Sequence, residues 1–488
     1  MPLLTVPRVA LLAGPVALAF FAGGFGDRPR LIALGVAGLV LALTALASPP
    51  RGLVPTGTGL RLALGGLAGL AGWVALSRGW SPLTDVAGDD AERVALYTVA
   101  FAVGLLAWRT RAAARLVEPA LAAGITAVTT YGLSGRLLPG LIPQTASRSA
   151  GGRFEQPLTY WNASGLYAVL GLLLCARILG DRDRPGWMRC LAAVATVPLG
   201  SGVYLTFSRG ALAALGGGLI VLLVVAPTWT QLRGTAIALE TAALGLLGPI
   251  LFPAVRTLAG SDATRQREGL LVLAAMIVAA AVGVALTRWA LRDERADRLR
   301  TGRLGLPQWS GTVAAVLAVA MVAVPPLLAR DDGGQGTTDP AFGATSARLV
   351  SAGSHRYDYW RVGLDTFADH PLRGIGSGGY GVAWLEARPQ PERIRDAHSL
   401  PIETLAELGL VGFLLLLSTA GGIALCARRV QAADPVLAAG PVAALVAFSL
   451  HASIDWHWEL PAVTLTALAL AGMIAAQASP EGPSGYAC

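Results

Sequence analysis

The chain has 488 residues, of which 54% are hydrophobic and only 14% are charged, and its mean hydropathy is +0.58. Soluble domains have roughly 25% charged residues, so this composition excludes an ordinary soluble enzyme. The formal net charge of +8 rests on 38 arginines, without a lysine, that are dispersed between apolar runs. Such dispersal excludes a nucleic-acid-binding patch and indicates a membrane protein.

Cysteine usage and the first apolar run narrow the class further. The four cysteines form no CxxC pair and have no histidine at metal-ligand spacing; they are Cys175, Cys190, Cys426 and Cys488. We therefore predict no disulfide framework and no zinc site. We also predict no cofactor. The run over residues 9–25 follows Arg8 and ends without a small-x-small cleavage pattern. It predicts a first membrane span, with a cleaved signal peptide as the alternative.

Apolar runs recur along the whole chain. A span needs roughly 20 mostly apolar residues, and about fourteen runs meet that template, give or take about two. Their centres lie near residues 17, 40, 67, 100, 124, 170, 197, 218, 243, 279, 318, 417, 443 and 468. The pattern predicts an all-α integral membrane protein with about 12–14 transmembrane helices.

One long polar stretch divides the runs. We predict an N-terminal bundle of about eleven spans over 1–328, an external loop over 329–398, about three spans over 399–478 and a short cytoplasmic tail over 479–488. The loop starts as a flexible linker, RDDGGQGTTDPAFG. Apolar side chains then recur at helical spacing: Tyr357, Trp360, Leu364 and Phe367. They predict an amphipathic helix lying along the membrane surface, followed by a glycine-rich turn, GIGSGGYG.

The distribution of arginines predicts the orientation. With the N-terminus in the cytoplasm, the short inner segments carry nineteen arginines and the short outer segments eleven, while eight lie in the long loop. Cytoplasmic segments carry the excess of positive charge, and long loops are exempt from this rule. We therefore expect a multi-pass protein of the cytoplasmic (inner) membrane whose long loop lies on the extracytoplasmic side.

One predicted span begins at the outer face with an arginine. A helix N-terminus presents free amide donors and the positive end of the helix dipole, which together attract an anion. The sequence TFSRGALAAL places Ser208, Arg209 and Gly210 at such a start, so a guanidinium adds its charge there. The alternative is that Arg209 only snorkels to the interface.

A second outward start follows His398, in AHSLPIETLAELG. Ser399 is placed to cap this helix, Pro401 falls in its first turn and Glu403 follows shortly after. The helix dipole disfavours an imidazolium, so we expect a neutral imidazole that can accept a proton as a general base. The alternative is that His398 is an interfacial polar residue.

Other polar residues have less specific patterns. The pairs Asp89–Asp90 and Asp331–Asp332 are predicted to be solvated loop charges, with a divalent-cation site as the alternative. Glu118 and Glu240 fall within apolar runs, where carboxylates are usually paired, protonated or functional. The remaining histidines, predicted to be structural or interfacial, are His355, His370, His451 and His457.

Four segments in this order resemble the O-antigen ligase and O-antigen polymerase superfamily of bacterial membrane glycosyltransferases. They are GGRFEQPLTYWNASGLYAVL, TFSRGALAAL, HRYDYWRVGLDTFADHPLRGIGSGGYG and DAHSLPIETLAELGLVGFLLLL, and they cover about a sixth of the chain. The last two are the more specific, because an Arg-x-x-x-Trp helix precedes His-Pro-Leu-x-Gly-x-Gly and then His with Glu-Leu-Gly-Leu-x-Gly.

The resemblance implies a polytopic fold of the GT-C kind and transfer of a glycan from an undecaprenyl-diphosphate carrier to an acceptor hydroxyl, without a nucleotide sugar or a metal. His398 matches the histidine taken to activate the acceptor, and Arg209 and Arg356 match arginines suited to the diphosphate. Weaker matches as substrate-binding residues are Arg153, Tyr160, Asn162, Ser208 and Arg361. Many relatives have asparagine where this chain has Ser399, which affects the acceptor pocket rather than the base.

The sequence is compatible with three functions. The first is an inverting transferase acting on a glycan, lipid or protein hydroxyl, either as a ligase or as a polymerase, since both share these motifs. The second is a secondary transporter or lipid-carrier flippase that uses Glu240 at mid-membrane. The third is a non-catalytic relative, which the presence of both His398 and Arg209 disfavours.

Overall fold

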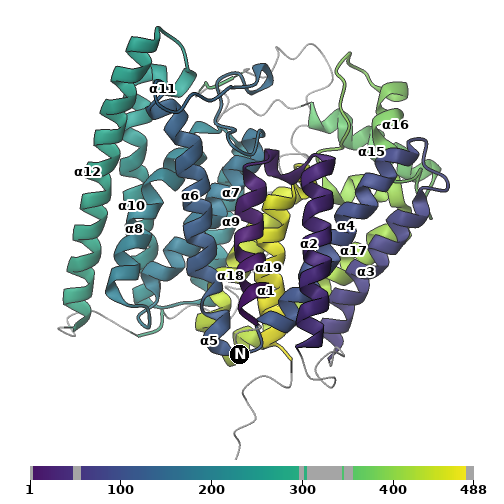
Figure 1. Ribbon diagram of the computed structural model, residues 1–488, viewed down its shortest axis with the longest axis horizontal. Helices are drawn as coiled ribbons and strands as arrows, with labels where there is room; N and C mark the ends of the chain where they lie inside the picture. Colours follow the sequence, from purple (N-terminus) through teal and green to yellow (C-terminus); the bar gives the residue numbers. More distant parts are fainter. Residues whose placement is uncertain (1–3, 48–56, 296–301, 305–342, 346–354, 480–488) are drawn as a thin grey trace, which may run out of the picture. The chain divides into compact units, whose positions relative to one another are not determined.

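The structure is a computed structural model that describes residues 4–47, 57–295, 302–304, 343–345 and 355–479. Within these ranges the chain is helical, without strands and with one isolated bridge between Thr228 and Arg303 (Figure 1). The predicted all-helical fold class is confirmed. The predicted span near residue 318, the flexible linker and Asp331–Asp332 lie outside the described residues.

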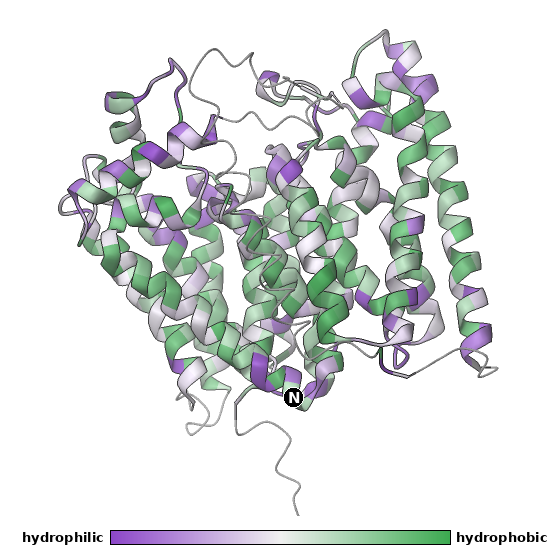
Figure 2. Cartoon of the chain, turned by 180° about the vertical axis from the view of Figure 1, so that it is seen from behind, coloured by the Kyte–Doolittle hydropathy of each residue, from purple (hydrophilic) through white to green (hydrophobic). Residues whose placement is uncertain are grey.

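In the described part of the chain, nine helical stretches are long and apolar enough to cross a membrane. They are Asp27–Leu46, Thr58–Ser77, Arg111–Leu137, Trp161–Gly180, Gly186–Leu205, Trp229–Leu251, Asp262–Glu294, Leu400–Ala433 and Pro435–Ala452. Shorter apolar helices cover Thr5–Ala19, Arg209–Val225 and Pro461–Gln477. Hydrophobic residues follow these helices along most of their length (Figure 2). The chain is therefore a multi-pass integral membrane protein.

The chain forms two compact units, each assembled from separate stretches of sequence. Unit one comprises Met1–Val117, Ser354–Asp434 and Ala452–Cys488, and unit two comprises Glu118–Gly353 and Pro435–His451. Unit one contains α1 (Thr5–Ala19), η2 (Ala22–Gly24), α2 (Asp27–Leu46), α3 (Thr58–Ser77), α4 (Thr84–Ala107), α5 (Arg111–Ala114), α15 (Arg356–Asp369), α16 (Tyr380–Ala387), α17 (Leu400–Ala433), η5 (His457–Glu459) and α19 (Pro461–Gln477).

In unit one, α17 packs along α3 even though some 340 residues separate them. Ser418 Oγ donates to Leu62 O at 3.1 Å, and Trp73 Nε1 donates to Leu408 O at 3.0 Å. The segment before α17 folds over its first turns, where α15 and α16 enclose a small apolar core. That core contains Tyr359, Val362, Tyr380, Trp384, Ala397 and Ala406. Residues 355–399 thus form a cap on the membrane helix that follows them.

The predicted amphipathic helix of the loop is α15, but it buries a different face from the one predicted. Its buried residues are Tyr359, Val362 and Gly363, whereas Leu364 of the predicted apolar stripe is 43% exposed. Tyr359, Val362 and Gly363 lie outside the predicted apolar stripe. They pack inward because α16 and α17 supply a second apolar surface that the helix's own periodicity does not reveal.

Unit two contains α6 (Val117–Leu137), η4 (Arg148–Ala150), α7 (Trp161–Gly180), α8 (Gly186–Leu205), α9 (Arg209–Val225), α10 (Trp229–Leu251), α11 (Pro253–Thr257), α12 (Asp262–Arg295) and α18 (Pro435–Ala452). Its central helix is α7, which is buried throughout its apolar stretch and packs against α8, α9 and α10. Near the start of α7, Phe154 joins Leu133, Val197 and Leu205 in an apolar core. This packing holds the starts of α7 and α9 in place.

Candidate active site

The site in unit one is built on an interruption of α17 at Gly409. That residue has φ +63° and ψ −164°, so the backbone groups on either side of it lose helical partners. The glycine-rich turn after α15 replaces them through four backbone hydrogen bonds. These run from Ile375 N to Ala406 O (3.1 Å), Gly376 N to Glu407 O (2.7 Å), Leu410 N to Pro371 O (2.8 Å) and Val411 N to Leu372 O (3.3 Å). The turn and the broken helix therefore position each other.

Glycine is required at the centre of this joint. Gly374 has φ +65°, and a Cβ there would lie 2.2 Å from the carbonyl carbon of Glu407. No side chain fits between backbones at that separation. The following Ser377 donates its hydroxyl to Asp90 Oδ2 at 2.6 Å, and its carbonyl accepts from Ser81 Oγ at 2.8 Å. The turn is thus fixed both to α17 and to the start of α4.

His398 occupies the last bend before α17. Its φ of +53° is left-handed, a conformation that costs free energy for a residue other than glycine. Ser399 is the N-cap residue and Pro401 lies in the first turn, as predicted, but the Ser399 side chain makes no capping hydrogen bond. Glu403 instead reaches back, and its Oε2 accepts from Ala397 N at 2.7 Å. This carboxylate fixes the peptide directly before His398.

The imidazole of His398 has a defined tautomer. Its Nδ1 lies 3.0 Å from Asp396 O, and a carbonyl oxygen can only accept, so Nδ1 carries the hydrogen. The ring centroid lies 5.4 Å from that of Tyr359 on α15, tilted by 46°. The Nε2 lone pair is therefore the one that can take a proton.

Burial lowers the pKa of His398 below its ordinary value, and the positive charge of Arg356 lowers it further against the opposing charge of Asp455. The imidazole is therefore neutral near pH 7, as the sequence predicted. The physical cause differs from the prediction, because burial contributes most and a neighbouring guanidinium adds to it. A neutral imidazole held in one tautomer is the state that a general base needs.

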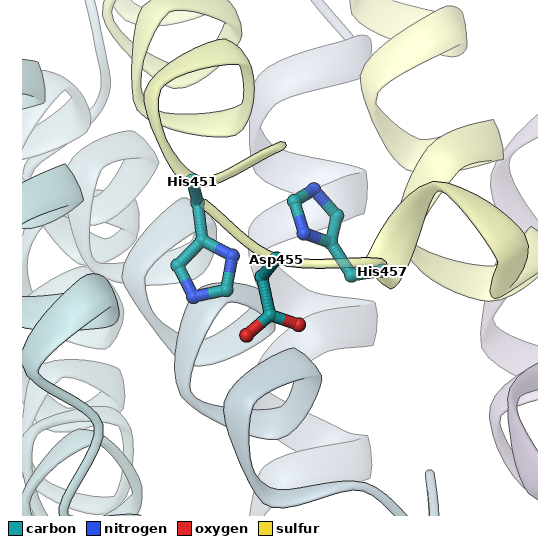
Figure 3. A group of neighbouring side chains, drawn as sticks. All are labelled: His451, Asp455 and His457. Atoms are coloured by element: carbon teal, nitrogen blue, oxygen red, sulfur yellow. The ribbon is translucent and has the colours of Figure 1, made fainter. Parts of the chain in front are cut away.

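Arg356, the first residue of α15, is anchored by a carboxylate that the sequence did not single out. Its Nη2 lies 2.5 Å from Oδ2 of Asp455, whose side chain is 1% exposed. Asp455 and the buried His457 follow α18 on the segment that leads into α19; Figure 3 draws them with His451, the last residue of unit two. The sequence signal that could have identified Asp455 is the DWHW stretch, in which a carboxylate lies among aromatic residues just before a span.

A small cavity lies between the starts of α4 and α17, the helix that follows His398. Its volume is about 50 Å³. Its charged and hydroxyl lining residues are Asp90, Arg93, Ser377, Glu403, Thr404, Glu407 and Glu459. Arg93 Nη1 lies 2.8 Å from Glu459 Oε2, and Arg93 Nη2 also contacts Asp90. Four carboxylates thus line the cavity with one guanidinium.

Three carboxylates at this place could hold a metal. Asp396, Glu403 and Glu459 each offer an oxygen, and these oxygens lie within 4.8 Å of one another. Oxygen donors suit Mg²⁺ and Ca²⁺. A bound proton can reduce the repulsion among these carboxylates in place of a metal. Burial and then the charge of Glu459 raise the pKa of Asp396 well above its usual range, which favours such a proton.

The favoured prediction for Asp89–Asp90, two solvated loop charges, is wrong. Both residues lie in the first turns of α4. Asp89 Oδ1 accepts from Arg30 Nη2 at 2.6 Å, while Asp90 pairs with Arg93 and accepts from Ser377. The pair had been assigned to an outer segment between two predicted spans, but Arg30 and Ser377, which are distant in sequence, bind these carboxylates on a helix.

In unit two, α9 begins at the predicted arginine. Ser208 is its N-cap, and Ser208 Oγ accepts from Ala211 N at 3.2 Å. Arg209 is the first helical residue and is half-buried. The predicted helix start with an arginine is confirmed, the cap by Ser208 adds to it, and this chemistry suits an anion.

The start of α7 lies beside the start of α9. A Cβ at Gly165 would lie 2.9 Å from Thr206 Oγ1 and 3.0 Å from Ala211 Cβ, so the first turns of the two helices are in contact. At the α7 start, Asn162 Nδ2 donates to Tyr160 Oη at 2.8 Å. The weaker candidates Tyr160 and Asn162 thus lie on the helix next to Ser208 and Arg209.

Arg153 is a buried arginine that holds the segment before α7. Its Nε donates to Ala150 O at 2.6 Å and its Nη2 to Ser149 O at 2.8 Å. The guanidinium carbon lies 3.6 Å from the ring centroid of Trp161. These contacts with its own segment give Arg153 a structural role at the start of α7.

Three other charged residues differ in their surroundings. Arg361 is 65% exposed and lies 3.2 Å from Asp358 on α15, so it is on the open side of the loop helix. Glu118 is buried, and its Oε2 accepts from Arg184 Nη2 at 3.0 Å, which confirms the expected pairing of a carboxylate within an apolar run. Glu240 is exposed on α10.

Fold and site together define a multi-pass membrane protein in which a polar loop caps an interrupted helix and brings a neutral histidine near an arginine. Residues 259–417 match a family model described as O-antigen ligase. The match covers about a third of the chain and confirms the resemblance predicted from the sequence. The match contains Arg356, Arg361 and His398, whereas Arg209 precedes it. The search of curated proteins gave no match.

Proposed function

We propose that this protein transfers a glycan from an undecaprenyl-diphosphate carrier to an acceptor hydroxyl at the extracytoplasmic face of the inner membrane. The observation that carries the proposal is the pairing of His398, neutral and with Nε2 as its basic nitrogen, with the nearby charge of Arg356 in the segment that matches the O-antigen ligase family. O-antigen ligases join a lipid-linked glycan to an acceptor, and this pairing supplies a base and a cation for that reaction.

The reaction proceeds by one displacement. The acceptor oxygen forms a bond to the anomeric carbon while the bond from that carbon to the diphosphate oxygen breaks, and the diphosphate leaves with the electron pair. His398 Nε2 takes the acceptor proton. Arg356 stabilises the negative charge that develops on the leaving group. Attack from the face opposite the diphosphate inverts the anomeric configuration.

The cationic charge for the leaving group is proposed to come from arginines, without a metal. A guanidinium is always protonated and binds phosphate oxygens in a bidentate manner. Asp455 holds the Arg356 guanidinium in place, so little ordering is needed when the donor binds. Arg209, at the start of α9, is proposed to bind diphosphate as well, with Tyr160 and Asn162 as weaker contributors.

The transporter alternative has less support. Transporters place decisive ionisable groups inside the bundle near mid-membrane. Glu240 is exposed on the surface of α10. The charged cluster of unit one lines the cavity between the starts of α4 and α17. The partners follow from the transferase proposal: a lipid-linked oligosaccharide as donor, a glycan, lipid or protein hydroxyl as acceptor, and the surrounding membrane lipids.

A reconstituted assay tests this function. The full-length protein in detergent is mixed with an undecaprenyl-diphosphate-linked oligosaccharide and a hydroxyl acceptor, with and without EDTA. We expect glycosylated acceptor and undecaprenyl diphosphate in equal amounts, an inverted anomeric configuration by NMR, and no effect of EDTA. In a parallel assay with the protein reconstituted in proteoliposomes, movement of the donor across the membrane without glycosylated acceptor would instead establish a transporter. Loss of transfer in EDTA with recovery in Mg²⁺ would overturn metal independence.

A further inference from the structure

Unit one contains an apolar groove that the proposed reaction does not use. The groove has a volume of about 560 Å³ and lies among α1, α2, α4 and α19. Its walls include Leu11, Gly14 and Leu18 of α1, Val36 of α2 and Val103 of α4. The one charged residue in its lining is Arg28. An apolar channel with one cation at its mouth has the shape of a site for a chain with a polar head.

The depth of the groove corresponds to one leaflet. Its lining on α2 extends from Arg28 to Val40, about 18 Å along the helix at 1.5 Å per residue. Half of a bilayer's hydrocarbon core is about 15 Å thick. The two lengths are similar, so a single lipid chain that enters beside Arg28 can fill the groove from one leaflet.

The mouth of the groove lies at the end of unit one that carries the loop. Phe25, three residues before Arg28, lies 5.8 Å from the ring of Trp456 and 5.9 Å from the guanidinium carbon of Arg395. Arg28 is itself exposed. A lipid in the groove thus belongs to the leaflet on the side of His398.

The charges around the mouth have both signs. Next to Arg28, the side chain of Asp27 is 71% exposed. Asp27, Asp89 and Glu92 share one buried guanidinium, that of Arg30, at 3.3, 2.6 and 3.2 Å. Three carboxylates around one arginine leave an excess of negative charge beside the cation Arg28. A head group that carries both a phosphate and an ammonium complements this pattern better than a purely anionic one.

We propose that this groove binds one acyl chain of a phosphatidylethanolamine molecule, whose phosphate contacts Arg28 and whose ammonium contacts Asp27. The primary ammonium matters because it donates hydrogen bonds to a carboxylate, which the trimethylated ammonium of phosphatidylcholine cannot do. The site is separate from the residues proposed for glycan transfer. It would keep a structural lipid on α1 and α2, the helices that border the mouth.

Two glycines provide a matched pair of variants. A Cβ at Gly14 or at Gly35 would meet nothing within 4 Å, so both positions accept a larger side chain without a clash. Gly14 lines the groove, whereas Gly35 lies on the exposed face of α2. Gly14→Leu therefore places a side chain inside the groove, and Gly35→Leu adds a side chain of the same size outside it, on the exposed face of α2.

Native mass spectrometry of the full-length protein in detergent measures the binding, with dioleoyl phosphatidylethanolamine, phosphatidylglycerol, phosphatidylcholine or undecaprenyl phosphate added. We expect one phosphatidylethanolamine per wild-type chain and at least about tenfold weaker binding in Gly14→Leu, because several methylene groups lose their site. Gly35→Leu retains binding. Asp27→Asn loses the preference for phosphatidylethanolamine over phosphatidylcholine. Circular dichroism confirms that each variant is folded.

Equal binding by Gly14→Leu and Gly35→Leu would show that the groove is not the site. Equal or tighter binding of phosphatidylglycerol would contradict the role of Asp27. Displacement of phosphatidylethanolamine by an equimolar amount of undecaprenyl phosphate would assign the groove to the polyisoprenyl carrier and overturn the proposed occupant.

Discussion

The two polar regions of this protein are assembled in different ways. In unit two, Ser208, Arg209 and Asn162 lie at the starts of adjacent helices, and Ser208 and Asn162 bond to neighbours within three residues. In unit one, His398 depends on α15, on Glu403 of α17 and on the joint between the glycine-rich turn and Gly409. A region of the first kind tolerates local change, whereas one of the second kind fails when any of its distant supports moves.

The largest effect is expected where the tertiary joint is broken. Gly374→Ala puts a Cβ against the backbone of Glu407 and has to displace the turn or α17. A displacement of about 1 Å in a positioned site costs on the order of a hundredfold in rate, so transfer should fall by about that factor. Gly381→Ala is the control, since its Cβ would meet ordinary contacts at 3.5 Å. Equal activity of the two variants in the transfer assay would refute the joint's role.

A somewhat smaller loss is expected for the anchored arginine. Arg356→Lys keeps the charge but loses the Nη2 contact with Asp455 and the paired donors that a guanidinium offers to a phosphate. We expect kcat/KM to fall about 10- to 100-fold, because charge-assisted bidentate contacts are among the strong ones. Arg393→Lys, at an exposed site of the same loop, should leave kcat/KM unchanged. A wild-type value for Arg356→Lys would mean that charge alone suffices.

The pH profile tests the coupling between the two residues. Burial and Arg356 lower the pKa of His398, so the neutral base should persist as the pH falls below about 6.5, the ordinary histidine value. The acid limb of kcat/KM is therefore expected below that pH. Removing the positive charge in Arg356→Gln raises the pKa of His398, so the limb of the residual activity should move to higher pH. An unchanged or lower limb would contradict the coupling.

The smallest effect is expected in unit two. Ser208→Ala removes one capping hydrogen bond from α9 and should cost about 1 kcal/mol of stability, measured by thermal unfolding in detergent. Because this support is local, the acid limb of the pH profile should stay where the wild type has it. A shift of that limb would show that the two regions are not independent in the way their construction suggests.

The positions of the helices and of their first residues could be predicted from the sequence, whereas contacts between residues distant in the chain could not. Hydropathy identified the membrane helices and the start of α9 at Arg209, and the Ser399 and Pro401 signals placed the start of α17 directly after His398. Motif order led to the family. Asp455 was missed because its partner Arg356 is 99 residues away. The helical position of Asp90 was missed for the same reason, since Ser377 and Arg30 satisfy the acidic pair only after folding.

The central claim, that His398 is the base of a glycan transfer, has a direct test with a matched control. His398→Ala and His370→Ala are purified in full-length form, and transfer from an undecaprenyl-diphosphate-linked oligosaccharide is measured for both. General-base catalysis contributes about 10²- to 10⁴-fold, so His398→Ala should lose at least about a hundredfold in kcat. His370→Ala, at an exposed position after α15, should match the wild type. Retention of more than about a tenth of wild-type transfer by a folded His398→Ala protein would contradict the account.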